Sequence, residues 1–165
     1  MGYTTEFEGQ FDLDKPLTDE QKLYITSFCG TRRMKRNADK AEKLNDPIRK
    51  TVGLPIGRDA EFFVGGLGTA GQDRDESIVQ YNDPPASQPG LWCQWVPNED
   101  GTAIEWDGGE KFYEYIEWIR YMINSFFKPW GVKLNGKVLW RGESFNDIGA
   151  IVIKNNKVSV KTIEV

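Results

Sequence analysis

Histidine is absent from this chain of 165 residues, and cysteine occurs only twice. Without histidine, the Ser/His and Cys/His pairs that activate a nucleophile cannot form. Cys29 and Cys93 are too few for a disulfide framework and are not spaced as metal ligands. Cys93 is expected to be a buried thiol, because free cysteine behaves as a small hydrophobe. Most familiar catalytic classes are therefore excluded.

Long apolar runs are also lacking. No segment approaches the roughly 18 apolar residues that a membrane span needs, and no charged-then-apolar leader opens the chain. We therefore expect a cytoplasmic protein without membrane contact. A chain of this length suits a single domain, residues 1–165, in which residues 53–90 form a long loop rich in glycine and proline.

Charge is unevenly distributed along the chain. Residues 31–50 contain eight basic residues and three acidic ones, whereas residues 98–117 contain seven acidic residues and one basic residue. The net charge of −4 argues against general nucleic-acid binding, which leaves a basic footprint. Within the basic segment, phosphate could be held by Arg32, Arg33 and Arg36. The alternative is that the two charged segments face solvent or attract each other.

The first half of the chain predicts one strand and two helices. Alternating apolar residues predict a strand over residues 3–13. Thr18 and Gln21 fit a capping box at a helix start, and Gly30 is expected to end that helix. A short polar helix is expected over residues 37–44. Inside the long loop, residues 61–64 and 77–81 are apolar interruptions.

The second half predicts strands around one amphipathic helix. Residues 91–96 and 102–106 are expected to form a hairpin. Asp107 and Glu110 would then cap a helix that ends at Pro129. Further strands are expected over 133–140, turning at Asn135-Gly136, and over 148–153 and 157–163, turning at residues 155–156.

This order predicts an α+β fold in two layers. An antiparallel sheet would carry two main helices packed on one face. A ferredoxin-like arrangement, the split βαβ, is the version that this order favours.

Tryptophan is concentrated in one part of the chain, where five of the six lie between Trp92 and Trp130. In the expected hairpin, alternation puts Trp92 and Trp95 on opposite faces of the sheet. One of these rings, or Trp106, could stack on a planar base. The alternative is a tryptophan packed under the long loop. That loop could add polar contacts from Tyr81, Asn82 and Asp83.

A glycine motif lies in the long loop. Residues 66–71 match GxGxxG, in which Gly66 and Gly68 would let the backbone approach a pyrophosphate. Acidic residues follow where a phosphate would sit, and no well-patterned helix comes next. We therefore expect a flexible loop, with a backbone nest for an anion or a moving lid as alternatives.

Three carboxylates fall along one side of the expected second helix: Glu110, Glu114 and Glu117. A metal or acid/base site would need further carboxylates, such as Glu105 or Asp107, to converge on them, and would favour magnesium or calcium. We expect instead a solvated helix face, with no metal and no cofactor.

The chain resembles a family of small uncharacterised phage and prophage proteins. The resemblance rests on the segment LWCQWVPNEDGTAIEWDGGEKFYEYIEWIRYMINSFFKPWG, on LNGKVLW and IVIKNN, and on the opening MGYTTEFEGQF with TRRMKR, so it covers nearly the whole chain. It implies a phage accessory protein in the host bacterial cytoplasm. By analogy with other small phage proteins, it would antagonise host immunity.

These observations predict a non-catalytic protein that binds and sequesters a small anionic nucleotide-type molecule. Aromatic rings would stack on the base, the arginines would meet phosphate, and the loop would close over it. One alternative is a protein–protein inhibitor that binds a host factor through its acidic 98–117 surface. Another is a carboxylate-dependent enzyme. The sequence is also compatible with a homo-oligomer.

Overall fold

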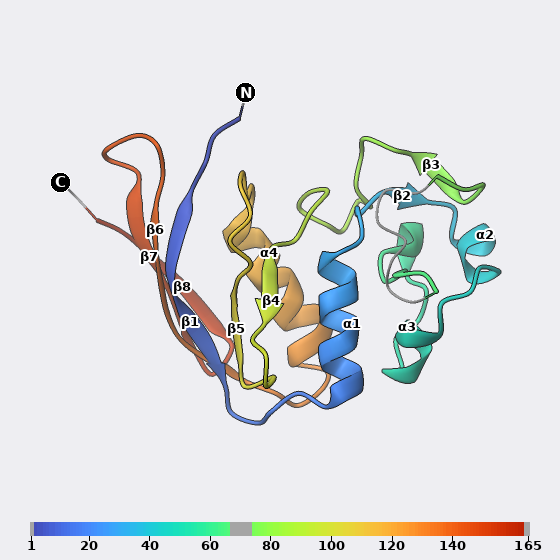
Figure 1. The fold of residues 1–165 in the computed structure, drawn as a ribbon, viewed down its shortest axis with the longest axis horizontal. Helices are drawn as coiled ribbons and strands as arrows, with labels where there is room; N and C mark the ends of the chain where they lie inside the picture. The colour runs from blue at the N-terminus through green and yellow to red at the C-terminus, as the bar shows by residue number, and fades with distance from the viewer. Residues whose placement is uncertain (1, 67–73, 164–165) are drawn as a thin grey trace. The chain divides into compact units, whose positions relative to one another are not determined.

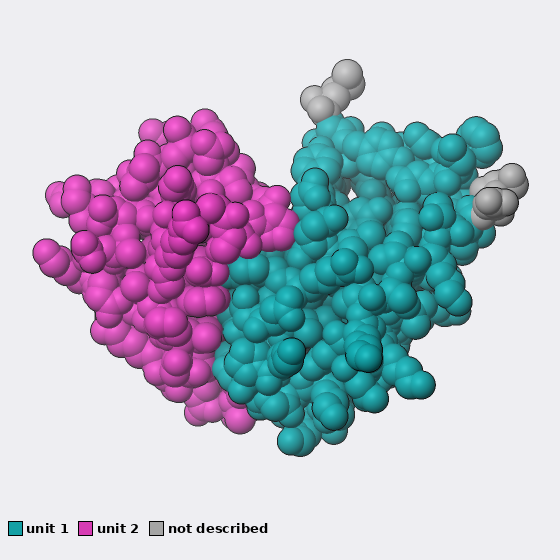
Figure 2. All heavy atoms as spheres, turned by 180° about the vertical axis from the view of Figure 1, so that it is seen from behind, with its two compact units in different colours: residues 1–17, 94–165 teal, residues 18–93 magenta. Residues whose placement is uncertain are grey.

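The computed structural model describes residues 2–66 and 74–163, and the chain forms two compact units. Unit 1 combines residues 1–17 with 94–165, and unit 2 comprises residues 18–93 (Figure 2). Antiparallel sheets and helices occur together, which confirms the predicted α+β class. Compact units can belong to one domain, so the single-domain expectation stays a prediction.

Unit 1 is built on a six-stranded antiparallel sheet with strand order β4-β5-β1-β6-β7-β8 (Figure 1). The strands are β1 (Glu6–Leu13), β4 (Trp95–Pro97), β5 (Ala103–Trp106), β6 (Leu134–Arg141), β7 (Ile148–Lys154) and β8 (Lys157–Thr162). β1 lies between β5 and β6, which are joined through the helix α4 (Tyr115–Met122). These elements make one split βαβ. The other neighbouring strands are joined by hairpins, so a second crossover of the ferredoxin-like kind is not formed by the described strands.

One face of this sheet packs against α4 and its continuation, the π-helical segment η2 (Ile123–Phe127). The Phe7 ring on β1 lies 4.9 Å from the Tyr115 ring, and Tyr115 lies 5.7 Å from Trp140 on β6. Ile119, Ile123 and Phe126, which helical spacing predicts on one apolar face, are buried, and so are Trp118 and Met122. Of the tryptophans concentrated in the sequence, Trp95 and Trp118 are fully buried in unit 1, where they contribute to its core.

The second main helix begins later than predicted. Asp107 and Glu110 do not cap it; α4 begins at Tyr115 after Glu114, which has a left-handed φ of 57°. Asp107 instead accepts a hydrogen bond from the Gly109 amide at 2.7 Å. The chain cannot be helical through this stretch, because Gly108 and Lys111 also have positive φ.

The predicted turn at Asn135-Gly136 is wrong. β6 runs through both residues, and Gly136 pairs with Phe11 on β1. Gly136 has a φ of 144°, and a Cβ there would lie 2.7 Å from the Gln10 carbonyl oxygen. The glycine therefore allows β6 to approach β1 closely, and it does not form a turn. By contrast, the predicted turn at residues 155–156 is confirmed between β7 and β8, with both asparagines at positive φ.

Unit 2 consists of short elements and one longer helix, α1 (Asp19–Cys29). The capping box of Thr18 and Gln21 is confirmed, and Gly30 caps the helix end. The remaining elements are β2 (Lys35–Arg36), α2 (Ala38–Glu42), α3 (Pro47–Thr51), the 3₁₀ turn η1 (Arg58–Ala60) and β3 (Ile78–Gln80). The apolar stretch 61–64 forms no strand, and the predicted loop 53–90 contains η1 and β3. Among the described helices, none is both long and apolar enough to cross a membrane.

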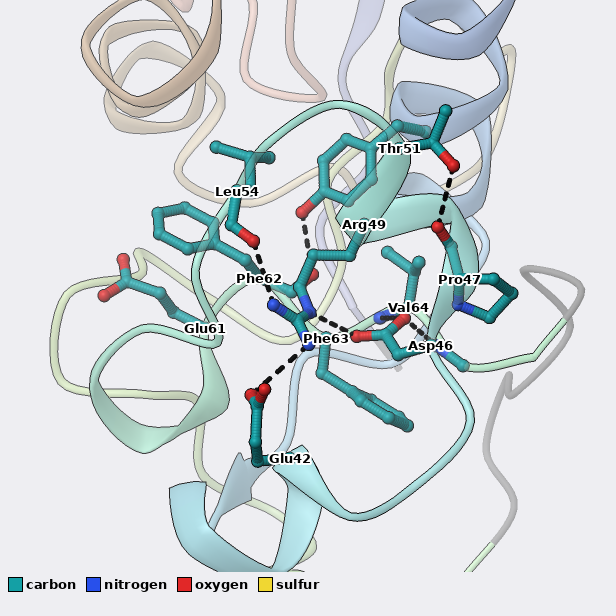
Figure 3. Close-up of polar contacts among 12 residues, drawn as sticks. Glu42, Asp46, Pro47, Arg49, Thr51, Leu54, Glu61, Phe62, Phe63 and Val64 are labelled. Carbon is teal, nitrogen blue, oxygen red and sulfur yellow. Dashed lines mark hydrogen bonds and ion pairs between the residues drawn. The ribbon is translucent and has the colours of Figure 1, made fainter.

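A buried ion pair organises the interior of unit 2. Asp46 is 1% exposed and accepts a hydrogen bond of 2.6 Å from Nε of the buried Arg49. Arg49 also donates to the Leu54 carbonyl at 2.9 Å and to Glu42 at 3.3 Å (Figure 3). Because buried charges must be paired and hydrogen-bonded, this network links α2, α3 and the segment that follows α3.

Candidate anion-binding site

Two arginines of unit 2 share one aromatic ring. The guanidinium carbon of Arg32 lies 4.4 Å from the centre of the Tyr81 ring, and that of Arg74 lies at the same distance. Arg32 also donates from Nε to the Tyr81 carbonyl at 3.1 Å and from Nη2 to Asn82 Oδ1 at 3.2 Å. Arg32, which is 49 positions from Tyr81 in the sequence, and Arg74 thus meet around the same ring.

The two-stranded ribbon of β2 and β3 positions these groups. Lys35 on β2 pairs with Gln80 on β3, and its amide donates to the Asp83 carbonyl at 2.8 Å. Arg32 precedes β2 in the chain, and Tyr81 directly follows β3. The ribbon therefore brings the predicted Arg32, Tyr81, Asn82 and Asp83 to the same end of two paired strands.

Arg36 anchors this ribbon from inside. It is 2% exposed, donates from Nη1 to Asp75 and to Ser77, and lies over the Phe63 ring at 4.4 Å. Partial burial raises the pKa of Asp75, but hydrogen bonds from Ser77 and Arg36 outweigh that effect and lower it. Asp75 therefore remains a carboxylate, and it forms an ion pair with Arg36.

Arg33 is likewise buried in unit 2, where it donates hydrogen bonds to the backbone. It is 3% exposed, donates to the Phe63 carbonyl at 2.8 Å and to the Glu61 carbonyl at 2.6 Å, and lies over the Phe28 ring at 4.1 Å. Of the three arginines singled out in the basic segment, two are thus core side chains. Only Arg32 reaches the surface.

Among the described residues, no carboxylate forms an ion pair with Arg32 or Arg74, whereas Arg36 and Arg49 both form ion pairs. Arg32 is partly exposed and Arg74 is exposed. An anion could therefore accept charge-assisted hydrogen bonds from either guanidinium group.

The three predicted tryptophans do not converge on this site. Trp95 is fully buried in unit 1, where it pairs with Trp106 and donates from Nε1 to the Tyr115 carbonyl at 2.9 Å. Trp106 is half-buried beside Phe7. β4 begins only at Trp95, so Trp92 is not on a strand face as expected, but on a partly buried segment of unit 2.

The glycine motif lies largely outside the described residues, and this includes Gly68. Gly66 is described and partly buried. The amides of Val64 and Gly65, just before it, already donate to Asp46 Oδ1 at 3.2 and 2.9 Å. An internal carboxylate therefore uses the two amides that directly precede the motif, and the predicted backbone nest itself lies outside the described residues.

Arg74 was missed by sequence reasoning. It stands between Asp73 and Asp75, so its neighbours made the segment look acidic. The only available signal was its distance of seven residues from Tyr81, which has no meaning until the short strand β3 is known to lie between them.

The acidic side chains of residues 98–117 stay near the surface. Glu110, Glu114 and Glu117 are exposed. Slight burial and the nearby charge of Glu117 raise the pKa of Glu114. In the part of the chain that the structure describes, no group of three or more His, Cys, Asp or Glu side chains could hold a metal ion.

Comparison of the chain with protein-family models, with curated proteins and with solved structures finds no match. The site is therefore interpreted from its own chemistry.

Proposed function

We propose that this protein is a non-catalytic binding protein that captures a small phosphate-bearing molecule of the nucleotide type at Arg32, Arg74 and Tyr81. The observation that carries the proposal is the pair of surface guanidinium groups, each 4.4 Å from one tyrosine ring and neither paired with a described carboxylate. Arginine is suited to phosphate because its planar fork donates two hydrogen bonds at once. Asn82 holds Arg32 in place from the side.

Trp92 is the tryptophan that we assign to base stacking. It belongs to the same unit as the arginine pair, and the amide of Arg33 donates to the Leu91 carbonyl at 2.7 Å. This hydrogen bond brings the backbone at residues 91–92 next to the backbone at residues 32–33. Stacking on an aromatic ring is worth about 1–3 kcal/mol per base and tolerates every base.

The proposal includes a biological setting. The resemblance to phage and prophage proteins supports action in a bacterial cytoplasm, where sequestering a nucleotide signal would antagonise host immunity. This setting rests on the sequence alone.

The test is binding of defined probes, measured by isothermal titration calorimetry. Pyrophosphate, ADP and a cyclic dinucleotide serve as probes for the wild type and for Arg32→Ala/Arg74→Ala. We expect the double variant to weaken binding about 10- to 100-fold, as expected for the loss of charge-assisted hydrogen bonds. Trp92→Ala should weaken binding of the two nucleotides but leave pyrophosphate binding unchanged.

The matched control is Arg58→Ala/Arg120→Ala, which removes two exposed arginines elsewhere. It lowers the net charge by the same amount and should retain binding. The proposal fails if none of the three probes binds, or if the control weakens binding as much as the site variant does.

A second candidate function is inhibition of a basic protein through the acidic 98–117 surface. The observation that favours it is the exposed pair of Glu114 and Glu117, whose mutual repulsion contributes to the raised pKa of Glu114. A cationic partner would remove that repulsion. Glu110→Lys/Glu114→Lys should then abolish capture of a basic partner in a pull-down, while the arginine variants retain it.

A further inference from the structure

β8 is an edge strand of the unit 1 sheet. It pairs with β7 on one side, and no described strand lies on its other side. The Ile163 amide donates to the Ile148 carbonyl at 2.8 Å. Hydrogen-bonded pairs alternate with unbonded pairs along an antiparallel ladder, so every second residue of β8 directs its amide and carbonyl away from β7. The residues that face the free edge in this way are Val158, Val160 and Thr162.

The helical layer stops short of this edge. On the face of the sheet that α4 and η2 cover, Ile151 of β7 is fully buried, whereas its partner Val160 on β8 is 38% exposed. Beside Val158 lies an open hollow of about 190 Å³, whose walls include Ile123 of η2 and Arg120 of α4. The edge strand therefore presents apolar side chains that the helices leave partly uncovered.

The opposite face of the sheet is basic along the same edge. Three exposed lysines lie there: Lys154 on β7, and Lys157 and Lys161 on β8. Lys137 on β6 separates them from the acidic side chains of β1. Within residues 2–66 and 74–163, none of these lysines forms an ion pair. Lys154 and Lys157 lie directly opposite each other, and like charges in that position destabilise a sheet, so this edge favours an anionic partner.

An extended peptide strand is complementary to both faces of this edge. Its backbone would pair with the free amides and carbonyls of β8, as in recognition by β-strand addition. Side chains of an added strand alternate between the two faces, so those opposite Val158 and Val160 would be apolar. Those opposite Lys157 and Lys161 would be acidic, and the one between them would face Ser159. The edge therefore selects the pattern acidic, apolar, polar, apolar, acidic.

The same lysines disfavour a second copy of this chain. Lysine on an edge strand is a common protection against pairing between identical edges. The stretch from Lys157 to Lys161 reads KVSVK, which is the same in both directions. Antiparallel pairing of two β8 strands around Ser159 would thus set lysine opposite lysine. An acidic strand turns this repulsion into attraction, so the edge discriminates between partners by charge.

We propose that the β8 edge binds an extended acidic segment of another protein, which adds a strand to the sheet of unit 1. The proposal goes beyond the arginine site of unit 2, because it uses unit 1 alone and stands whether or not that site binds phosphate. Added salt should weaken the binding, because the charges involved lie at the surface.

The test is fluorescence anisotropy with three labelled peptides of equal length. The probe contains the core Glu-Val-Thr-Val-Glu. One control peptide has lysine in place of both glutamates, and the other rearranges the same five residues as Glu-Glu-Thr-Val-Val. The probe should bind and the lysine peptide should not. The rearranged peptide should bind about tenfold more weakly or less, because it cannot place its acids on one face and its valines on the other.

Charge reversal on β8 should reverse this preference. Lys157→Glu/Lys161→Glu should lose the probe and bind the lysine peptide instead, which also shows that the variant folds. The matched control is Lys40→Glu/Lys43→Glu on and beside α2 in unit 2. It changes the net charge equally and should bind the probe as the wild type does.

Val160→Pro separates strand addition from attraction between charges alone. Proline removes an amide that faces the free edge and leaves the hydrogen bonds between β8 and β7, and edge strands tolerate proline at such positions. With both lysines of β8 in place, this variant should bind the probe about tenfold more weakly, whereas Val160→Ala, which keeps the amide, should lose less. In the wild type, the probe should slow amide hydrogen exchange at Val158, Val160 and Thr162.

Three results would overturn the proposal. The first is a probe that does not bind the wild type at any concentration. The second is Val160→Pro that binds as tightly as the wild type, or a rearranged peptide that binds as tightly as the probe, since either shows that no strand is added. The third is a single-stranded oligonucleotide that displaces the probe and binds more tightly, which would assign the lysines to nucleic acid.

Discussion

At the scale of single residues, Asp46 shows what a fully buried charge requires. Both of its carboxylate oxygens accept hydrogen bonds. Oδ2 accepts from Arg49, and Oδ1 accepts from the amides of Val64 and Gly65. Glu42 contacts the same arginine, but its side chain is 50% exposed. The two carboxylates that pair with Arg49 therefore differ both in burial and in the number of hydrogen bonds that they accept.

Asp46→Asn should lower the free energy of unfolding by about 3 kcal/mol, because it leaves the Arg49 charge buried without its main partner. Glu42→Gln should lower it by less than about 1 kcal/mol, since exposed ion pairs contribute little. Urea denaturation of both variants and the wild type measures the difference. Equal losses would contradict this account of Arg49.

Tyr115 predicts a loss of stability at alkaline pH. Burial, and next the charge of Asp147, raise its pKa from 10.0 to about 12. The unfolded chain therefore ionises this tyrosine before the folded protein does. Its contribution to stability is complete below pH 10 and is lost as the pH rises from there towards 12.

Tyr115→Phe keeps the ring but cannot ionise. It therefore separates the loss of stability that Tyr115 causes at alkaline pH from the loss that other ionising groups cause. Unfolding free energies of both proteins should be measured at a series of pH values from neutral to strongly alkaline. The stability difference between them should change as the pH rises above 10. A constant difference across the whole series would show that Tyr115 does not carry the effect.

At the scale of elements, local sequence signals succeeded where the determining contacts are themselves local. The capping box of Thr18 and Gln21 lies within one helical turn and was predicted correctly. The Asn155-Asn156 turn depends on two residues that tolerate positive φ, and it too was predicted. Asn135-Gly136 carries an even stronger turn signal, yet it lies inside β6, because its pairing with β1 decides the outcome.

Gly136→Ala should be much more destabilising than Gly53→Ala. Both glycines have positive φ, so both variants suffer backbone strain of about 1–2 kcal/mol. Only at Gly136 would the new Cβ also meet a backbone oxygen, whereas Gly53 has open space around it. We expect an additional loss of about 1–3 kcal/mol at Gly136, measured by thermal or urea unfolding. Similar losses at both sites would contradict the close approach of β1 and β6.

At the scale of the whole molecule, the order of the chain and the order of the sheet disagree. β1 comes first in sequence but lies in the interior of the sheet, where it pairs with β5 on one side and β6 on the other. Unit 1 is thus closed only after the chain has passed through unit 2 and returned at Gln94. The first strand cannot pair on both sides until the chain has reached β6.

Deletion of residues 1–13 should abolish cooperative unfolding of unit 1, because β1 joins the β4–β5 hairpin to the β6–β8 strands. Deletion from residue 157 onward removes an edge strand that pairs only with β7, and should weaken the fold without abolishing it. Thermal unfolding followed by near-ultraviolet circular dichroism, which reports the aromatic core, distinguishes the two. Cooperative unfolding after loss of β1 would be the contradicting result.

The sequence by itself determined the α+β class, the capped helix α1, the apolar stripe of α4 and the last hairpin, because these depend on periodicity and on contacts within a few residues. Only the tertiary structure decided which arginines of the basic segment are buried. Arg33 and Arg36 bind groups 28 to 41 residues away, and Arg32 meets Tyr81 and Arg74 across the β2–β3 ribbon. Burial and pairing at such separations depend on the path of the whole chain, and a local pattern of residue types carries no record of that path.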